Sequence, residues 1–181
     1  MRMTKKLIVI LMMCFIVFSA VSISAQNRKG AVTLNPQIGG YMFEGNQNIK
    51  TTVTYGLGIG YNFDENWAAE GNFNYIDSSS VSPSGEDVKA YVYRLDGLYH
   101  FMPDSKFVPY LAAGIGAITI DGGIDGNGSD PLFNYGAGIK YFIAKNLALR
   151  GDVRHIITDD PTNNLIYTAG LTYLIGGEEK Q

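Results

Sequence analysis

Charged residues stand at every second position in two stretches of this chain, at 94 and 96 and at 150, 152 and 154. The residues that share one face of their predicted strands in this way are Glu70, Arg94, Asp96, Lys140, Arg150, Asp152 and Arg154. A period of two places such side chains on the same side of a β-strand. Four cations and three anions would then meet on one surface. Charges in a narrow interior are costly unless they pair, so the near balance predicts a network of ion pairs and hydrogen bonds.

The glycine runs and one acidic stretch resemble ligand-binding loops, but their context argues against that function. The runs at residues 56–60 and 114–116 lie inside predicted strands, with no helix after them to complete a dinucleotide-binding turn. Asp121–Asp130 is rich in Asp and Gly, like a calcium loop. An EF-hand needs Glu at its twelfth position, and Leu132 or Gly136 stands there instead. We interpret the stretch as an acidic outer loop, with weak divalent binding left open, and expect no metal site and no cofactor.

The two histidines of the chain, His100 and His155, are the remaining candidates for catalysis. Ile156, Ile157 and Thr158 follow His155, so no serine stands close behind it to act as a nucleophile. Its parity with Leu149 and Val153 places it on the apolar face of its strand. We therefore interpret His155 as an interfacial side chain and expect no catalytic residue.

Alternating apolar and polar residues predict the strands that would carry the charges. In Thr52–Phe63 every odd position is Val, Tyr, Leu, Ile or Phe, and every even position is Thr, Gly or Asn. The other predicted strands are Ala31–Glu44, Trp67–Asp77, Val88–Met102, Phe107–Ile120, Leu132–Ile143, Leu147–Ile157 and Leu165–Ile175. The first changes parity at Gly39-Gly40, where we expect a bulge, so that Tyr41 joins the apolar face. An even number of strands with an apolar face outside and a polar face inside predicts an all-β, eight-stranded antiparallel up-and-down transmembrane barrel.

Two features of the connections and aromatics support a membrane barrel. Short turns at residues 64–66, 103–106 and 144–146 alternate with longer polar connections at 44–50, 78–86, 121–131 and 158–164. Aromatic residues gather at both ends of the predicted strands. Those beside the short turns are Phe63, Trp67, Tyr99, Phe101, Phe107, Tyr141 and Tyr173, and those toward the long connections are Tyr41, Phe43, Tyr75, Tyr91, Phe133 and Tyr167. Two belts match the two interfaces of a bilayer.

The first 25 residues are typical of a signal peptide for export. Arg2, Lys5 and Lys6 precede an apolar run from Leu7 to Ser19, and Ser24-Ala25 provides a cleavage site. We therefore divide the chain into a leader, residues 1–25, and a barrel domain, residues 26–181. Removing the three leader cations leaves 11 Lys and Arg against 17 Asp and Glu, a net charge of −6. Such an acidic domain is a poor binder of nucleic acid.

Several segments in order resemble the OmpA/OprF-type family of outer-membrane barrels. They are Pro36–Asn48, Tyr55–Tyr75, Val108–Gly116 and Leu147–His155, and the resemblance spans Ala31 to Gly177. Many members continue into a periplasmic peptidoglycan-binding domain; the sequence stops four residues after Gly177, so we expect that cell-wall anchoring does not carry over from the resemblance. The last strand resembles the terminal motif read by the insertion machinery, with Thr168, Gly170, Tyr173 and Ile175 at its key positions. Ile175 replaces the usual final aromatic residue.

The resemblance implies a monomer in the outer membrane of a Gram-negative bacterium. Its implied partners are outer-membrane lipid, lipopolysaccharide, the assembly machinery and periplasmic chaperones. Two interpretations of the charged interior remain open, namely a structural plug and a porin-like gate that passes small solutes when ion pairs exchange partners. Binding through the outer loops, as an adhesin or receptor, is the alternative function, and modification of lipid A is a third.

Overall fold

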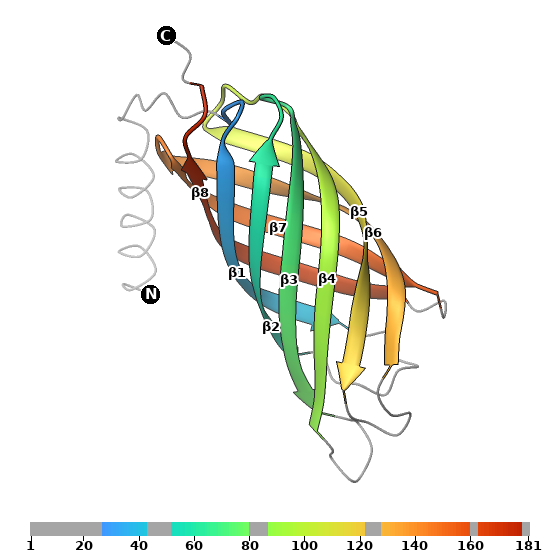
Figure 1. Cartoon of the computed structure of the whole chain (residues 1–181). Helices are drawn as coiled ribbons and strands as arrows, with labels where there is room; N and C mark the ends of the chain where they lie inside the picture. The colour runs from blue at the N-terminus through green and yellow to red at the C-terminus, as the bar shows by residue number, and fades with distance from the viewer. Residues whose placement is uncertain (1–26, 43–51, 80–86, 122–127, 160–162, 179–181) are drawn as a thin grey trace, which may run out of the picture.

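Eight strands pair in sequence order to form a closed antiparallel barrel, in which β8 returns to pair with β1 (Figure 1). The computed structural model describes residues 27–42, 52–79, 87–121, 128–159 and 163–178. The strands are β1 Val32–Met42, β2 Thr52–Asn62, β3 Trp67–Ser79, β4 Asp87–His100, β5 Phe107–Asp121, β6 Gly128–Ala144, β7 Leu147–Thr158 and β8 Asn163–Ile175. The predicted fold is therefore confirmed. Among the described residues, no helix is long and apolar enough to cross a membrane.

The two ends of the barrel differ, and we name them by their connections. At the short-turn end, residues 63–66, 101–106 and 145–146 link consecutive strands. At the long-loop end the connections at residues 43–51, 80–86, 122–127 and 160–162 lie outside the described residues, as does the predicted leader. The strands β4, β5 and β6 are the longest, and together with β3 they extend farthest toward the long-loop end (Figure 1).

The largest error in a predicted boundary is at β6, which begins at Gly128 rather than at Leu132, whereas the other described boundaries differ by two residues or fewer. Gly128, Ser129 and Asp130 pair with Ile120, Thr119 and Ile118 of β5. The end of β5 offers unpaired backbone groups, and continuing the ladder satisfies them. Part of the stretch interpreted as an acidic loop is therefore strand.

The apolar face of each strand lies on the outside of the barrel. On β2 the side chains of Leu57 and Ile59 are 48% and 55% exposed, and Leu95 of β4 is 60% exposed. The neighbouring positions point inward and are mostly buried. An apolar exterior around a polar interior is the arrangement of a barrel that contacts lipid.

The predicted bulge in the first strand, and with it the outward position of Tyr41, was wrong. The β1–β2 register is continuous from Val32↔Tyr61 to Tyr41↔Thr52, and Tyr41 points inward with none of its surface exposed. The two glycines serve close packing against β8 instead. A Cβ on Gly39 would lie 1.8 Å from the Tyr167 carbonyl oxygen, and one on Gly40 would lie 2.3 Å from the Tyr167 hydroxyl. Phe43, predicted to lie in the same belt, is outside the described residues.

Inside the barrel, apolar side chains form a layer toward each end. The outer layer, at the long-loop end, consists of Tyr41, Ile76, Ala90, Val92, Ile118, Leu132, Ile156 and Ile166. The inner layer, at the short-turn end, consists of Ala31, Val108, Phe142, Ala148 and Leu174. Polar and charged residues lie along the strands between these two layers.

Candidate functional site

The structure places all seven charged residues inside the barrel, on β3, β4, β6 and β7. Each is between 1% and 6% exposed. Inward glycines on neighbouring strands make room for their long side chains. A Cβ on Gly114 would lie 2.2 Å from Asp96 Oδ1, and one on Gly136 would lie 2.7 Å from Arg154 Cδ. The glycine runs are therefore needed for the packing of the lumen.

Asp152 is the most heavily bonded carboxylate of the network. Arg154 donates from Nε to Oδ1 at 2.6 Å and from Nη2 to Oδ2 at 2.9 Å, a two-point contact between residues two apart on β7. Arg150 Nη2 lies 3.3 Å from Oδ2. The Tyr110 hydroxyl donates to the same oxygen at 2.5 Å and accepts from Arg150 Nε at 2.7 Å. Tyr110 therefore joins Asp152 and Arg150 into one hydrogen-bonded unit.

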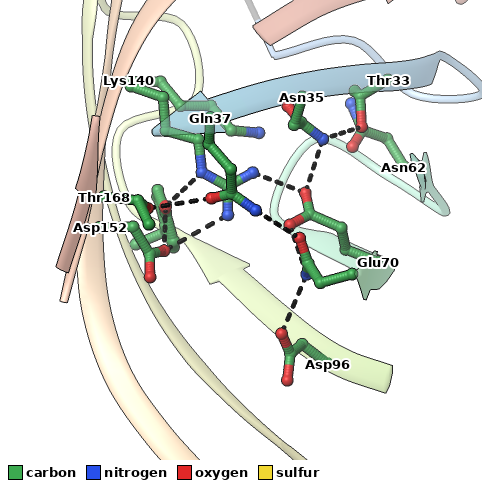
Figure 2. Close-up of polar contacts among 12 residues, drawn as sticks. Thr33, Asn35, Gln37, Asn62, Glu70, Asp96, Lys140, Asp152 and Thr168 are labelled. Carbon is green, nitrogen blue, oxygen red and sulfur yellow. Dashed lines mark hydrogen bonds and ion pairs between the residues drawn. The ribbon is translucent and has the colours of Figure 1, made fainter. Parts of the chain in front are cut away.

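Glu70 connects this unit to the opposite wall of the barrel. Its Oε2 accepts from Arg150 Nη1 at 2.7 Å and from Asn35 Nδ2 on β1 at 2.8 Å. Its Oε1 accepts from Asn72 Nδ2 at 2.9 Å. Figure 2 shows Asn35 and Glu70 in contact, with Asp96 beyond them and Asp152 on the other side. The network thus crosses the lumen.

Asp96 is held mainly by amides. Asn134 Nδ2 donates to its Oδ1 at 2.8 Å, and Asn72 Nδ2 lies 3.1 Å from its Oδ2. Two guanidinium groups are more distant, since Arg154 Nη1 is 3.6 Å and Arg94 Nη1 is 3.7 Å from Oδ2. Arg94 donates from Nη2 to Asn74 Oδ1 at 3.2 Å, while its Nε and Nη1 have no hydrogen-bond partner among the described residues. Arg94 is therefore the least anchored arginine of the network.

Lys140 belongs to a separate cluster near the short-turn end. Its Nζ lies 2.8 Å from His100 Nε2 and donates to Asn27 Oδ1 at 3.4 Å. Within the described part of the chain, no carboxylate oxygen lies within ion-pair distance of Nζ. An ammonium donates to Nε2 only if that nitrogen carries no proton. The proton is then on Nδ1, which lies 3.0 Å from the Asn66 carbonyl oxygen.

Sequence reasoning missed Tyr110, the inward position of His100 and the bridging amides. Parity alone was sufficient to find them. Tyr110 alternates with the outward Phe107, Leu111 and Ile115, and His100 has the parity of Asp96. The small residues of β5 obscure its alternation, and uncharged inward residues such as Tyr110 carry no charge to mark them in the sequence.

The other candidates lie on the outer wall or on β8, and of these Thr168 reaches the network through Gln37 and Asn72. His155 is on the outer wall, where its ring packs edge-on against Tyr135 and its Nδ1 lies 3.0 Å from the Tyr135 hydroxyl. In β8, Thr168 points inward and donates to Gln37 Oε1 at 2.9 Å, and Gly170 also points inward. Tyr173 and Ile175 face outward. β8 therefore presents the motif residues to both sides of the wall.

The network's chemistry is that of mutual neutralisation. Each of the three carboxylates lies within 4 Å of at least one guanidinium, and each also accepts a hydrogen bond from an asparagine amide or from the Tyr110 hydroxyl. A carboxylate held by Arg and by amides is poorly placed to take up a proton from a substrate. The arrangement is suited to filling and stiffening the lumen.

Comparison with known proteins identifies the family of the chain and solved structures with a similar fold. A family model described as "Outer membrane protein beta-barrel domain" matches residues 11–173, and no curated protein matches the chain. Among solved structures, Neisserial surface protein A is 14% identical, with a TM-score of 0.65 over 80% of this chain and 99% of that one. The N-terminal barrel of Pseudomonas aeruginosa OprF is 20% identical, with a TM-score of 0.60 over 82% and 99%. Yersinia pestis Ail, the attachment invasion locus protein, is 16% identical, with a TM-score of 0.55 over 81% and 99%. The family match covers most of the chain, and the protein therefore belongs to the outer-membrane β-barrel domain family.

Proposed function

We propose that this protein is a structural outer-membrane barrel whose lumen is plugged by its own side chains. The observation that carries the proposal is the position of the paired charged network between the two apolar layers. An ion that crosses the lumen would have to pass both layers and separate the pairs between them. Apolar constrictions exclude ions because the ions would lose their hydration.

Conductance in planar bilayers tests this proposal. We expect the folded wild-type barrel to show no single-channel steps in KCl, with folding checked by its shifted migration on unboiled SDS gels. The matched variant is Ile118→Ser with Ile156→Ser, which makes the outer layer polar and leaves the ion pairs intact. Because the charged network still blocks the lumen, this variant should also stay silent. Regular wild-type steps would contradict a plug.

A porin-like gate is the second candidate, and the weak anchoring of Arg94 favours it. Its guanidinium approaches Asp96 at only 3.7 Å and has two nitrogens without hydrogen-bond partners among the described residues. Such a side chain moves at less cost than one held by two short bonds. If the wild-type barrel conducts and Arg94→Ala changes the conductance, the gate is the better account.

The outer surface supports a role in binding as a further candidate. At the long-loop end, Asp77, Lys89 and Asp121 form an outward polar row across β3, β4 and β5. Charged residues on the outer face are expected outside the lipid-facing band. The parts of β3 to β6 at and beyond this row would therefore project from the membrane at the long-loop end. Ail resembles this chain in fold alone. Replacing the long connections should abolish cell attachment and leave gel migration unchanged if the barrel acts as an adhesin.

Processing and partners follow from the same proposal. We infer that the leader is cleaved after Ala25, that the short turns face the periplasm and that chaperones deliver the chain to the assembly machinery, which reads β8. The barrel is then a monomer among outer-membrane lipids and lipopolysaccharide, with no catalytic role. Amino-terminal sequencing tests the cleavage. Unchanged lipid A in cells that express wild-type protein or His155→Ala is the result expected of a non-enzyme.

A further inference from the structure

The chain crosses the short-turn mouth of the barrel before it enters β1. Residues 27–30, which we call the strap, lie at the end of the barrel where β8 finishes (Figure 1). Asn27 is only 1% exposed although it precedes the first strand, whereas Lys29 is exposed. A residue outside the sheet is normally solvated, so the burial of Asn27 requires specific contacts.

Asn27 is bonded to three separate parts of the barrel. Its backbone N–H donates to the Pro103 carbonyl at 3.0 Å, in the turn between β4 and β5. Its Nδ2 donates to the Glu65 carbonyl at 2.7 Å, in the turn between β2 and β3. Its Oδ1 accepts from Asn62 Nδ2 at 3.2 Å and from Lys140 Nζ at 3.4 Å. This one residue therefore ties two turns, one through its backbone and one through its side chain, to the short-turn end of the lumen, which we call its floor.

The rest of the strap is held by hydrogen bonds to its backbone groups. Asn62 donates from Nδ2 to the Arg28 carbonyl at 2.9 Å, and its own carbonyl accepts from the Gly30 N–H at 2.8 Å. The Glu178 N–H donates to the Lys29 carbonyl at 2.9 Å. These contacts hold the backbone across the mouth and leave the Lys29 side chain outside.

The contact with Lys140 explains why the strap matters to the interior. This buried ammonium has no carboxylate partner among the described residues, so it depends on His100 and on the Asn27 amide oxygen. A buried charge that loses a partner gains by admitting water. We propose that the strap is a lid, latched by Asn27, that closes the short-turn mouth and keeps water away from the floor of the lumen.

The lid can be tested by thiol labelling of a buried position. Cys14 is the only cysteine and belongs to the leader, so the barrel domain, residues 26–181, carries no thiol of its own. Ala68→Cys then places a buried thiol inside the barrel on β3, at the position that pairs with Asn62 of β2. Lys145→Cys places a thiol on an exposed turn as the reference. The folded barrel in lipid nanodiscs is treated with a charged methanethiosulfonate reagent, which does not enter lipid.

We expect the buried thiol of Ala68→Cys to react at least 100-fold more slowly than the exposed thiol of Lys145→Cys when the latch is intact. Asn27→Ala removes the side-chain bonds of the latch and should raise the reaction rate of the buried thiol about tenfold or more, as the loss of two or three net hydrogen bonds implies. Lys29→Ala is the matched control in the same segment, because it removes only an exposed ion pair with Glu178. It should leave the rate within about twofold.

Three outcomes would overturn the lid. One is rapid labelling of the buried thiol with the latch intact, which would mean that the mouth is open. Another is an unchanged rate in Asn27→Ala whose unboiled gel migration shows a folded barrel. The last is an equal increase in Lys29→Ala, which would assign the effect to general loosening of the segment. The conductance experiment tests the plug separately, because the outer apolar layer is intact in all of these variants.

Discussion

Arg154 contacts both carboxylate oxygens of Asp152, at 2.6 and 2.9 Å, although the two residues lie on the same strand. The superficially similar pair Arg94 and Asp96 is different, since its closest approach is 3.7 Å and no hydrogen bond forms. Both pairs have the same spacing in sequence. Their difference arises from the neighbouring strands, because Asn134 and Asn72 occupy the oxygens of Asp96.

The first prediction compares these two pairs by double-mutant cycles. Arg154→Ala or Asp152→Ala alone should cost about 1.5–3 kcal/mol, because each removes two short charge-assisted hydrogen bonds, while Asp152 keeps Arg150 and Arg154 keeps Asp96 as a second partner. The double replacement should cost less than the sum of the singles, with a larger interaction energy than for Arg94 and Asp96. Urea unfolding in lipid vesicles measures both cycles. Additive effects for Arg154 and Asp152, or a stronger coupling in the other pair, would contradict the geometry.

The second prediction concerns the hydroxyl of Tyr110. Tyr110→Phe leaves Asp152 and Arg150 without a shared partner in the interior, at a cost of about 1–3 kcal/mol. Tyr135→Phe is the control, since that hydroxyl lies on the outer wall, where its hydrogen-bond partner among the described residues is His155. Its free energy of unfolding should change by less than about 0.5 kcal/mol. Equal effects of the two replacements would argue against a special role for Tyr110.

The third prediction separates inward from outward glycines. A Cβ on Gly138 would lie 2.2 Å from the Tyr110 hydroxyl and 2.6 Å from the Gly151 carbonyl oxygen. Gly138→Ala should therefore destabilise the barrel by about 1–3 kcal/mol through overpacking. On the outer face, a Cβ on Gly71 would meet its nearest atom at 3.9 Å, so Gly71→Ala should be tolerated. A larger loss of unfolding free energy in Gly71→Ala than in Gly138→Ala would contradict the assignment of inward and outward faces.

The fourth prediction tests the outer wall with a charge. Ile59 is more than half exposed on the apolar side of β2. Ile59→Arg should cost about 2–4 kcal/mol if the position lies near the midplane of the bilayer. Ile59→Leu keeps the apolar contact and should change the unfolding free energy little. A harmless arginine at this position would mean that the side chain is not in lipid.

The strand pattern was predictable because lipid and the lumen impose opposite demands on alternate residues. Where both demands act, as on β2 and β4, the predicted strands and faces agree with the structure. The predicted outward position of Tyr41 was wrong because it rested on the aromatic side chain. Uninterrupted alternation from Val32 places Tyr41 inside the barrel. The interior of the barrel is apolar near the long-loop end. Because this apolar layer is built from several strands, the pattern of any single strand does not predict it.

Contacts between distant segments could not be inferred from alternation. Arg150 and Glu70 are 80 residues apart, and Lys140 and Asn27 are 113 apart. Parity assigns each charge to the interior, but the partner of each charge depends on strand tilt and on the small residues between them. The strap has no periodic pattern at all, because it lies before the first strand.

The central claim is that the apolar faces of the strands contact lipid around a filled interior, and tryptophan fluorescence tests the lipid contact most directly. Trp67 is the only tryptophan, so Trp67→Phe with Leu95→Trp places a single indole on the outer face of β4. In vesicles of lipids with brominated acyl chains, we predict strong quenching of this indole and no quenching by aqueous iodide. Quenching by iodide, with none by the brominated chains, would contradict the claim.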